Sequence, residues 1–322
     1  MHISNNMIRK EIRVKGMLFR CLLPFFTKKK FKVINKIMVL MKHKNFSKSL
    51  KMDEIYIKRP DNTKLRVVIY RSKSNGYSVS SKMPGVLWIH GGGYGIGVPE
   101  QDFMFAEILE ERQNCVIFMP DYCLATQAPY PAALDDCYLA LKYMKEHASK
   151  YNINIDQIFT GGDSAGGGLC TALNLKARDL KEVDIAFTMP LYPMLDARET
   201  TSSKNNDAPV WNTKSNKAGW DIYLNNQEMT KYSVPALEDD FSEFPPTITY
   251  IGTIEPFYDE TKDFVKKLRA CGVKVAYKEY KGCFHAFDIL CGNTKVGQDA
   301  RKYLGDHFEY ACKHFTSSTL LK

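Results

Sequence analysis

The chain has 322 residues, of which 44% are hydrophobic and 25% charged, a composition that fits a folded globular protein and excludes a disordered or fibrous one. The net charge of +9 is uneven, because residues 1–51 contain 14 Lys and Arg and a single acid, Glu11. The rest of the chain therefore has a net charge of −4, which argues against a nucleic-acid groove across the protein.

The basic N-terminal segment is predicted to contain an amphipathic helix. Its apolar residues at helical spacing are Ile34, Ile37, Met38 and Met41. Lysines fill the positions between them. Two interpretations are open: a cap whose apolar stripe packs on the body, or a helix that lies on an anionic membrane surface. We favour the cap.

We divide the chain into a basic helical cap segment, residues 1–52, and a catalytic domain, residues 53–322. No stretch approaches the length of a membrane span. The early apolar run at residues 17–26 is interrupted by Arg20 and lacks the cleavage site of a signal peptide. The nine cysteines are odd in number and lack metal-type spacing, which favours reduced thiols. We expect a cytoplasmic protein.

From residue 53 onward, short β-rich runs alternate with helical stretches, a pattern typical of a mostly parallel sheet with helices on both faces. An antiparallel pair opens the sheet at residues 53–58 and 64–71. Further strands are predicted at 86–90, 115–119, 157–160, 185–190, 247–252 and 274–280. Helices are predicted at 101–112, 131–147, 165–178, 259–270 and 296–314. Between residues 196 and 233 the periodicity fades, so we expect a cap insertion there.

The segment Gly162-Asp163-Ser164-Ala165-Gly166 follows one predicted strand and opens the next helix. The spacing G-x-S-x-G in this position is typical of a nucleophile elbow, a tight turn that exposes a serine hydroxyl. Glycine suits the turn because it has no Cβ to clash. A structural serine in a glycine-rich turn is the less favoured alternative.

A serine hydroxyl needs a base, and in this chain order the base follows the nucleophile and the acid. The histidines in that part of the chain are His285, His307 and His314. The last two fall in the predicted final helix, whereas His285 lies in a loop directly after a predicted strand. Active sites of open α/β sheets form at such loops, so we favour His285 as the base.

The acid that orients the histidine is expected after the strand at residues 247–252. Asp259 and Glu260 open a helix there, where carboxylates are common for capping reasons alone. Glu255 lies in the loop itself, and a carboxylate there can accept a hydrogen bond from the imidazole and offset its charge. We favour Glu255 and keep Asp259 as the alternative.

The run His90-Gly91-Gly92-Gly93 ends another predicted strand and can supply backbone N–H groups to a developing oxyanion. A phosphate cradle is the competing interpretation. It is discounted because the run matches neither a G-x-G-x-x-G fingerprint nor a P-loop. The glycine loop and the serine elbow together indicate acyl transfer.

These motifs resemble those of the hormone-sensitive lipase group of α/β-hydrolases, the bacterial family IV esterases, over about residues 54–290. The motifs are His90-Gly91-Gly92-Gly93, Asp121-Tyr122, Pro129-Tyr130-Pro131-Ala132-Ala133, Gly162-Asp163-Ser164-Ala165-Gly166-Gly167, Glu255-Pro256 and His285-Ala286-Phe287. The resemblance implies an α/β-hydrolase fold with a helical cap from the N-terminus and the insertion, which favours the cap interpretation of the basic segment.

The resemblance also implies roles for individual residues. Ser164 would be the nucleophile and His285 the base, with an oxyanion hole formed by amides of Gly91, Gly92, Gly93 and Ala165. Glu255 would hold the acid position, where the family usually has Asp. A second departure is Cys123-Leu124-Ala125-Thr126-Gln127, where relatives commonly have Arg-Leu-Ala-Pro-Glu.

The resemblance therefore implies a serine carboxylesterase that hydrolyses short- to medium-chain acyl esters, for example acetyl esters, through an acyl-enzyme. We expect a small-molecule ester as the partner, no nucleic acid, no metal and no organic cofactor. An amidase or lactonase on the same triad and a non-catalytic ligand-binding relative are the alternatives. Trp211, Trp220 and Tyr223 could line a substrate pocket or pack inside the cap.

Overall fold

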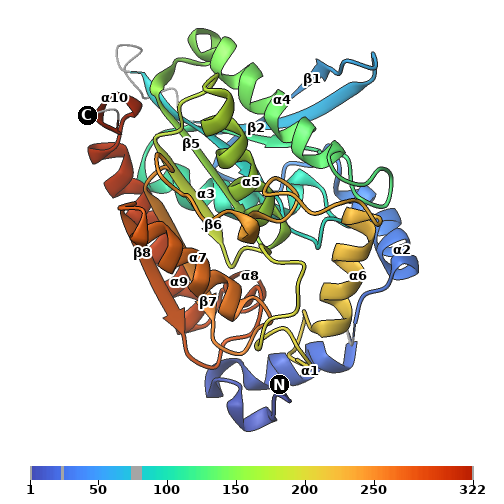
Figure 1. Cartoon of the computed structure of the whole chain (residues 1–322). Coiled ribbons are helices and arrows are strands. Elements are labelled where there is room, and N and C mark those ends of the chain that lie inside the picture. The colour runs from blue at the N-terminus through green and yellow to red at the C-terminus, as the bar shows by residue number, and fades with distance from the viewer. Residues whose placement is uncertain (1, 23–24, 74–81, 321–322) are drawn as a thin grey trace.

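The computed structural model of the protein describes residues 2–22, 25–73 and 82–320. Within these ranges one eight-stranded sheet has the order β1-β2-β4-β3-β5-β6-β7-β8 (Figure 1). The strands are β1 (Leu50–Lys58), β2 (Lys64–Ser72), β3 (Met83–Ile89), β4 (Val116–Pro120), β5 (Ile153–Asp163), β6 (Phe187–Leu191), β7 (Thr247–Gly252) and β8 (Val275–Tyr280). β2 is antiparallel to β1 and to β4, and the remaining neighbours are parallel.

Helices cover both faces of the sheet, which explains why every residue of β4, β6 and β7 is buried. The larger helices are α3 (Phe103–Arg112), α4 (Ala132–Glu146), α5 (Ala165–Leu180), α7 (Tyr258–Ala270) and α9 (Lys295–His314). On one face α4 packs against α5, and α5 shares a buried cluster with α7 through Leu175, Phe264 and Leu268. On the other face α3 packs against α9. The α/β-hydrolase architecture predicted from the sequence is confirmed.

The N-terminal segment forms α1 (Arg13–Leu22) and α2 (Lys28–Met38), with the short 3-10 helices η1 (Asn5–Met7), η2 (Lys10–Ile12) and η3 (Val39–Met41). Thr27 caps α2, because its side chain accepts a hydrogen bond from the amide of Lys30. α1 runs along the bottom of the molecule in Figure 1, and α2 packs against α6 (Thr213–Leu224) at the right. The short elements η4 (Pro99–Asp102), η5 (Ala148–Tyr151), η6 (Pro235–Leu237), α8 (Phe287–Leu290) and α10 (Ser317–Leu320) complete the chain.

The predicted face of the N-terminal helix is partly wrong. Ile37 was placed on the stripe that packs on the body, but its side chain is 61% exposed. Phe31 is the fully buried residue of α2, and Ile34 and Met38 are half-buried. The helix is therefore rotated about its axis relative to the predicted orientation, because the large ring of Phe31, and not Ile37, packs against the body.

Element boundaries shift by a few residues from the predicted ones. β5 starts at Ile153 rather than 157, and β6 starts at Phe187 rather than 185. α6 lies inside the predicted insertion at residues 196–233, for which the resemblance implies a helical cap. The periodicity did not give the bounds of this helix, because its buried face includes the polar residues Ser215 and Asn216. No helix in the described ranges is long and apolar enough to cross a membrane.

Candidate active site

Ser164 lies at the turn between β5 and α5 with φ +56° and ψ −120°, a conformation that costs energy for any residue except glycine. The turn lies directly against the end of β3. A Cβ on Gly166 would come within 2.0 Å of the carbonyl oxygen of Ile89, so only glycine fits at this position. The local sequence thus forms the strained strand-to-helix elbow that the motif predicts.

Three side chains far apart in the sequence form one chain of contacts at this elbow. His285 Nε2 lies 2.8 Å from Ser164 Oγ, and His285 Nδ1 is hydrogen-bonded to Glu255 Oε2. The second carboxylate oxygen of Glu255 accepts a hydrogen bond of 2.8 Å from the Gly252 amide. The exposed fractions of Ser164, His285 and Glu255 are 5%, 4% and 0%. The arrangement can move a proton from the hydroxyl to the imidazole and stabilise the resulting charge.

The sheet and the neighbouring rings hold His285 in place. Ser164, Glu255 and His285 follow the carboxyl ends of β5, β7 and β8. These strands run parallel, so their carboxyl ends lie on the same side of the sheet. The rings of Tyr192 and Phe257 meet the imidazole edge-on, with centroid distances of 5.1 Å and 5.0 Å. These two contacts restrict rotation of the imidazole.

The other acidic candidates near this loop have different partners. Asp259 Oδ2 accepts a hydrogen bond of 2.7 Å from the Ser202 amide. Glu260 is buried and accepts a hydrogen bond of 2.7 Å from the Leu195 amide. Burial raises the pKa of Glu260 well above its usual range. Glu255 is thus the carboxylate in contact with His285, and Asp259 is occupied elsewhere.

The glycine loop after β3 lies next to the elbow, but Gly91 differs from expectation. Its amide donates a hydrogen bond of 2.8 Å to Asp163 Oδ1 and is therefore not available to an oxyanion. Within the described residues, the amides of Gly92 and Gly93 donate to no carbonyl or side chain, and Ala165 stands at the free N-terminus of α5. These three amides remain as candidate oxyanion donors.

A buried pair of carboxyl groups, Asp163 and Asp102, lies next to this glycine loop. Asp163 lies beside Asp102, which accepts a hydrogen bond of 3.0 Å from Trp88 Nε1. Burial, together with the neighbouring charge of Asp102, raises the pKa of Asp163 well above its usual value. Burial also lowers the pKa of His90, whose ring stacks on Tyr122 at 4.3 Å. Asp163 and His90 therefore favour their neutral forms and anchor the loop by hydrogen bonding and packing.

Asn35 of α2 binds the same loop from the side of the N-terminal segment. Its side-chain NH₂ group donates a hydrogen bond of 2.7 Å to the carbonyl of Gly95, and its side-chain oxygen accepts one of 3.2 Å from the amide of Gly97. This two-point contact was not predicted. The only sequence signal is the position of Asn35, four residues after the buried Phe31 and hence on the same face of the helix.

Of the three aromatic residues left open by the sequence, only Trp211 reaches the site. A Cβ on Gly93 would lie 2.2 Å from the Trp211 ring, and Trp211 is 6.3 Å from the His285 ring. Phe26 of the N-terminal segment packs against Trp211, with 5.5 Å between the ring centroids. Trp220 and Tyr223 pack instead around Tyr94, at 5.3 Å and 3.9 Å.

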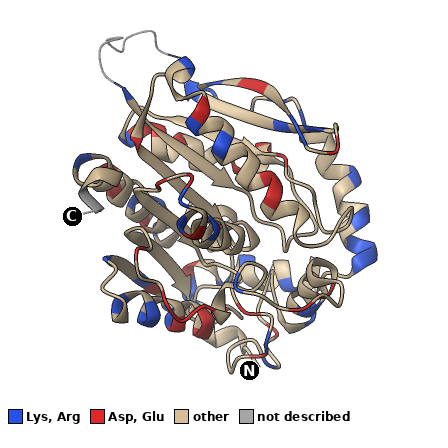
Figure 2. Ribbon diagram, turned by 45° about the horizontal axis from the view of Figure 1, so that its top comes forward, with Lys and Arg blue, Asp and Glu red and all other residues tan. Residues whose placement is uncertain are grey.

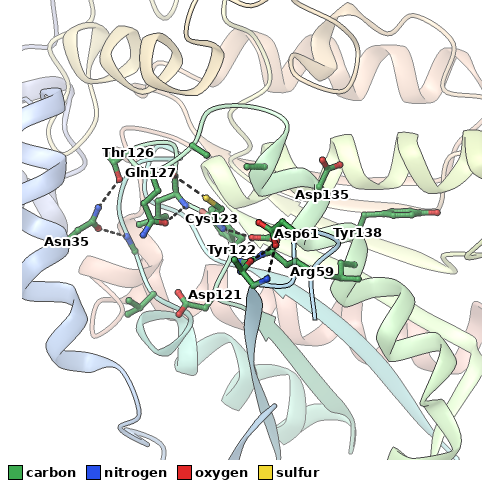
Figure 3. Close-up of a pocket in the computed structure, with 18 of the residues that line it drawn as sticks. Asn35, Arg59, Asp61, Asp121, Tyr122, Cys123, Thr126, Gln127, Asp135 and Tyr138 are labelled. Carbon is green, nitrogen blue, oxygen red and sulfur yellow. Dashed lines mark hydrogen bonds and ion pairs between the residues drawn. The ribbon is translucent and has the colours of Figure 1, made fainter. Parts of the chain in front are cut away.

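A cavity of about 1190 Å³, shown in Figure 3, has none of Ser164, His285 and Glu255 among its lining residues. It is open to solvent and is lined mainly by residues of α2, the turn between β1 and β2, the loop after β4, and α4. Its charged side chains are largely paired with one another. Arg59 contacts both oxygens of Asp136 at 2.6 Å and 2.8 Å, and Lys42 binds Asp121 at 2.6 Å. This pairing leaves few charges to recognise a ligand.

The match to a protein family covers most of the sheet and the site. A model of the alpha/beta hydrolase fold family matches residues 86–289. The chain belongs to this family. This α/β-hydrolase is 27% identical over 232 residues to an esterase of Gibberella moniliformis, covering 70% of this chain and 72% of that protein. It is 28% identical over 218 residues to carboxylesterase NlhH of Mycobacterium tuberculosis, covering 65% and 68%.

Solved structures share the fold at lower sequence identity. Esterase LipW of Mycobacterium marinum superposes with a TM-score of 0.85 at 24% identity, covering 96% of this chain and 97% of that one. A bacterial heroin esterase gives the same TM-score and identity, with coverage of 96% and 99%. The resemblance to the hormone-sensitive lipase group, stated from the motifs, is confirmed at the level of family and fold.

Two further findings concern metals and thiols. No group of three or more His, Cys, Asp or Glu side chains among the described residues could hold a metal ion. All nine cysteines are free, and Cys115, Cys137, Cys170, Cys283 and Cys291 are buried.

Proposed function

We propose that this α/β-hydrolase is a serine carboxylesterase acting on short- to medium-chain acyl esters through an acyl-enzyme. The contact chain from Ser164 through His285 to Glu255 carries the proposal, because it joins a nucleophile, a base and an orienting acid in one buried cluster. The names of the relatives, esterase and carboxylesterase, support an ester as the substrate class.

The reaction follows from these positions. Ser164 Oγ attacks the ester carbonyl carbon while His285 Nε2 takes its proton, and Glu255 stabilises the imidazolium through Nδ1. The carbonyl oxygen becomes an oxyanion that accepts hydrogen bonds from the amides of Gly92, Gly93 and Ala165. Each such donor lowers the barrier by about 3 kcal/mol.

The second half of the reaction uses the same groups. His285 returns the proton to the departing alcohol, which leaves the acyl group on Ser164. Water then attacks the acyl carbonyl while His285 takes a proton from it. The second oxyanion collapses, the bond to Ser164 Oγ breaks, and His285 gives its proton to Oγ, which releases the acid and restores the hydroxyl. Each step balances without an oxidant, a metal or an organic cofactor.

We also propose that residues 1–52 and the insertion at 196–233 form the cap over this site. The Phe26 amide donates a hydrogen bond of 2.9 Å to Ser215 Oγ. The Arg9 amide donates one of 2.8 Å to the carbonyl of Gly282, three residues before His285. The Trp211 ring lies against Gly93 of the glycine loop, and the Phe26 ring packs against Trp211 at a tilt. Large rings over a nearly buried serine favour small acyl groups.

A series of p-nitrophenyl esters from acetate to laurate tests the proposal. We expect hydrolysis to be fastest for the shorter esters and to fall by at least about 10⁴-fold in Ser164→Ala. Equal rates for the wild type and Ser164→Ala on every ester would overturn it. Trp211→Ala is expected to move the preference toward longer chains, because it removes the ring above Gly93.

A further inference from the structure

Apolar side chains are exposed mainly on the N-terminal segment. Of the fifteen large hydrophobic side chains exposed among the described residues, ten lie before residue 47. The same segment carries most of the positive charge of the protein. Soluble proteins rarely gather exposed apolar residues in one place unless that place binds something.

On α1 the exposed apolar side chains form one stripe. Val14, Leu18 and Leu22 follow each other at intervals of four residues and are 54–80% exposed. The opposite face of α1 docks on the body, where a Cβ on Gly16 would lie 2.9 Å from the Phe284 ring. The orientation of the helix is therefore fixed, and its apolar stripe faces outward.

α2 has a second outward stripe. Val33, Ile37 and Leu40, the last in the 3-10 turn that follows the helix, are 59–66% exposed. Phe31 is buried on the inner face, and Asn35 binds the glycine loop there. The helix cannot rotate to hide the outer stripe without breaking these contacts.

The two stripes meet where the helices join. A hollow of about 290 Å³ between them is lined by Leu22 of α1 and Val33 of α2, together with Phe25, Lys29 and Lys30. Leu22 ends the first stripe and Val33 begins the second, so the two stripes adjoin at this hollow. We call this surface, made by Val14, Leu18, Leu22, Val33, Ile37 and Leu40, the outer apolar surface.

Lysines border the outer apolar surface. α2 contains five lysines and no acid, and all five are exposed. Figure 2 shows this charge in blue along α2, at the right of the molecule, with no red beside it on the helix. The only acid of residues 1–51, Glu11, is paired with Arg9 at 2.7 Å. The charge around the stripes is therefore not neutralised by the segment itself.

We propose that α1 and α2 dock on an anionic phospholipid bilayer, with the outer apolar surface at the headgroup–acyl boundary and the lysines of α2 at the phosphates. An apolar face flanked by lysines is what such a surface binds. A second copy of the chain would bring the same positive charges together and is disfavoured by repulsion. The cap and membrane interpretations are compatible, because the inner and outer faces of the helices serve different contacts.

The proposal goes beyond the esterase function and does not depend on Ser164. Flotation of the full chain with vesicles tests it, using phosphatidylcholine alone and phosphatidylcholine mixed with about one third phosphatidylserine. We expect binding to the anionic vesicles only, and release when NaCl rises from about 0.05 M to about 0.5 M. Absence of binding at low salt would overturn the proposal.

A triple variant separates this surface from general stickiness. Val33→Ser, Ile37→Ser and Leu40→Ser combined should weaken vesicle binding by roughly tenfold or more, because apolar area is lost from the interface. Hydrolysis of a water-soluble ester should be unchanged, which shows that the variant is folded. Binding equal to that of the wild type would contradict the assignment of this face.

The chain offers a matched control. Ile155, Leu180 and Met229 belong to the body and are exposed to 41–49%. Their combined replacement by Ser should leave vesicle binding as in the wild type. Equal losses in both triple variants would overturn the proposal, as would a concentration-dependent dimer, seen by sedimentation, that only the Val33, Ile37 and Leu40 variant abolishes.

Discussion

The N-terminal segment and the body that begins at β1 treat their apolar and charged residues in opposite ways. The body has a net charge of −4 over residues 52–322 and buries most of its apolar side chains, with ion pairs such as Arg66 with Glu100 at 2.7 Å inside it. The segment has a large positive charge and turns apolar stripes outward. This difference fits the two proposals, which place the catalytic groups in the body and the membrane contact in the segment. Asn35 connects the two regions.

The first prediction concerns the body and tests which carboxylate orients His285. Glu255→Gln should lower kcat by roughly 10⁴-fold, because the imidazolium loses its carboxylate partner. Asp259→Asn should leave kcat within a few fold, since Asp259 binds the Ser202 amide and not His285. Steady-state kinetics on p-nitrophenyl acetate measure both. The reverse ranking would assign the acid to Asp259.

The second prediction concerns the glycine loop, where the body meets the insertion. Gly93→Ala should cost roughly 10²-fold in kcat, because the new Cβ collides with Trp211 and displaces an oxyanion donor.

A control variant separates this collision from the backbone strain alone. Gly272 also has a positive φ, of +77°, but no atom lies within 4 Å of a Cβ placed there. Gly272→Ala should therefore keep full activity, with only a small loss of thermal stability. Similar losses of kcat in both variants would show that the loop is not an oxyanion site.

The third prediction tests the link between the regions. Asn35→Leu removes both contacts with Gly95 and Gly97, and we expect kcat to fall roughly tenfold with little change in KM, because the loop amides lose their alignment. Lys36→Leu, on the exposed side of the same helix, is the matched control. If the two variants behave alike, the segment has no part in positioning the loop.

The smallest effect is expected in the pH dependence of stability. The pKa of Asp163 is raised in the folded protein, chiefly by burial, so the folded state keeps a proton that the unfolded state loses above its ordinary pKa of 3.8. This contribution to stability is present at low pH and declines as pH rises toward the folded pKa.

Asp163→Asn removes that titration while keeping an oxygen for the Gly91 amide. The Tm of this variant should fall less than that of the wild type between about pH 4 and pH 8, measured by calorimetry. Parallel Tm curves would mean that Asp163 is charged in the folded protein.

The sequence predicted the fold and the neighbourhood of the site better than the contacts within it. The elbow at Ser164 and the loop of His285 follow from local motifs and chain order, and their catalytic roles are a proposal. The use of the Gly91 amide by Asp163 depends on a hydrogen bond across 72 positions, which no local pattern reveals. The Asn35 contact spans 60 positions for the same reason.

Errors in the helices have a related cause. A stripe including Ile37 fits helical spacing as well as one including Phe31, and only the shape of the body decides between them. A helical cap was expected in the insertion, but the bounds of α6 were not predicted, because polar side chains such as Asn216 are buried on the helix and weaken its apolar period. Spacing thus predicts that a face exists, whereas packing determines what it touches.

The most direct test of the central claim, that Ser164 is the nucleophile, is covalent capture. Diethyl p-nitrophenyl phosphate reacts with an activated serine and forms a stable phosphoryl ester, releasing p-nitrophenol. We predict one adduct per chain by intact mass, located at Ser164 by peptide mapping, with loss of esterase activity in proportion. An adduct on another residue, or full activity after complete labelling of Ser164, would contradict the account.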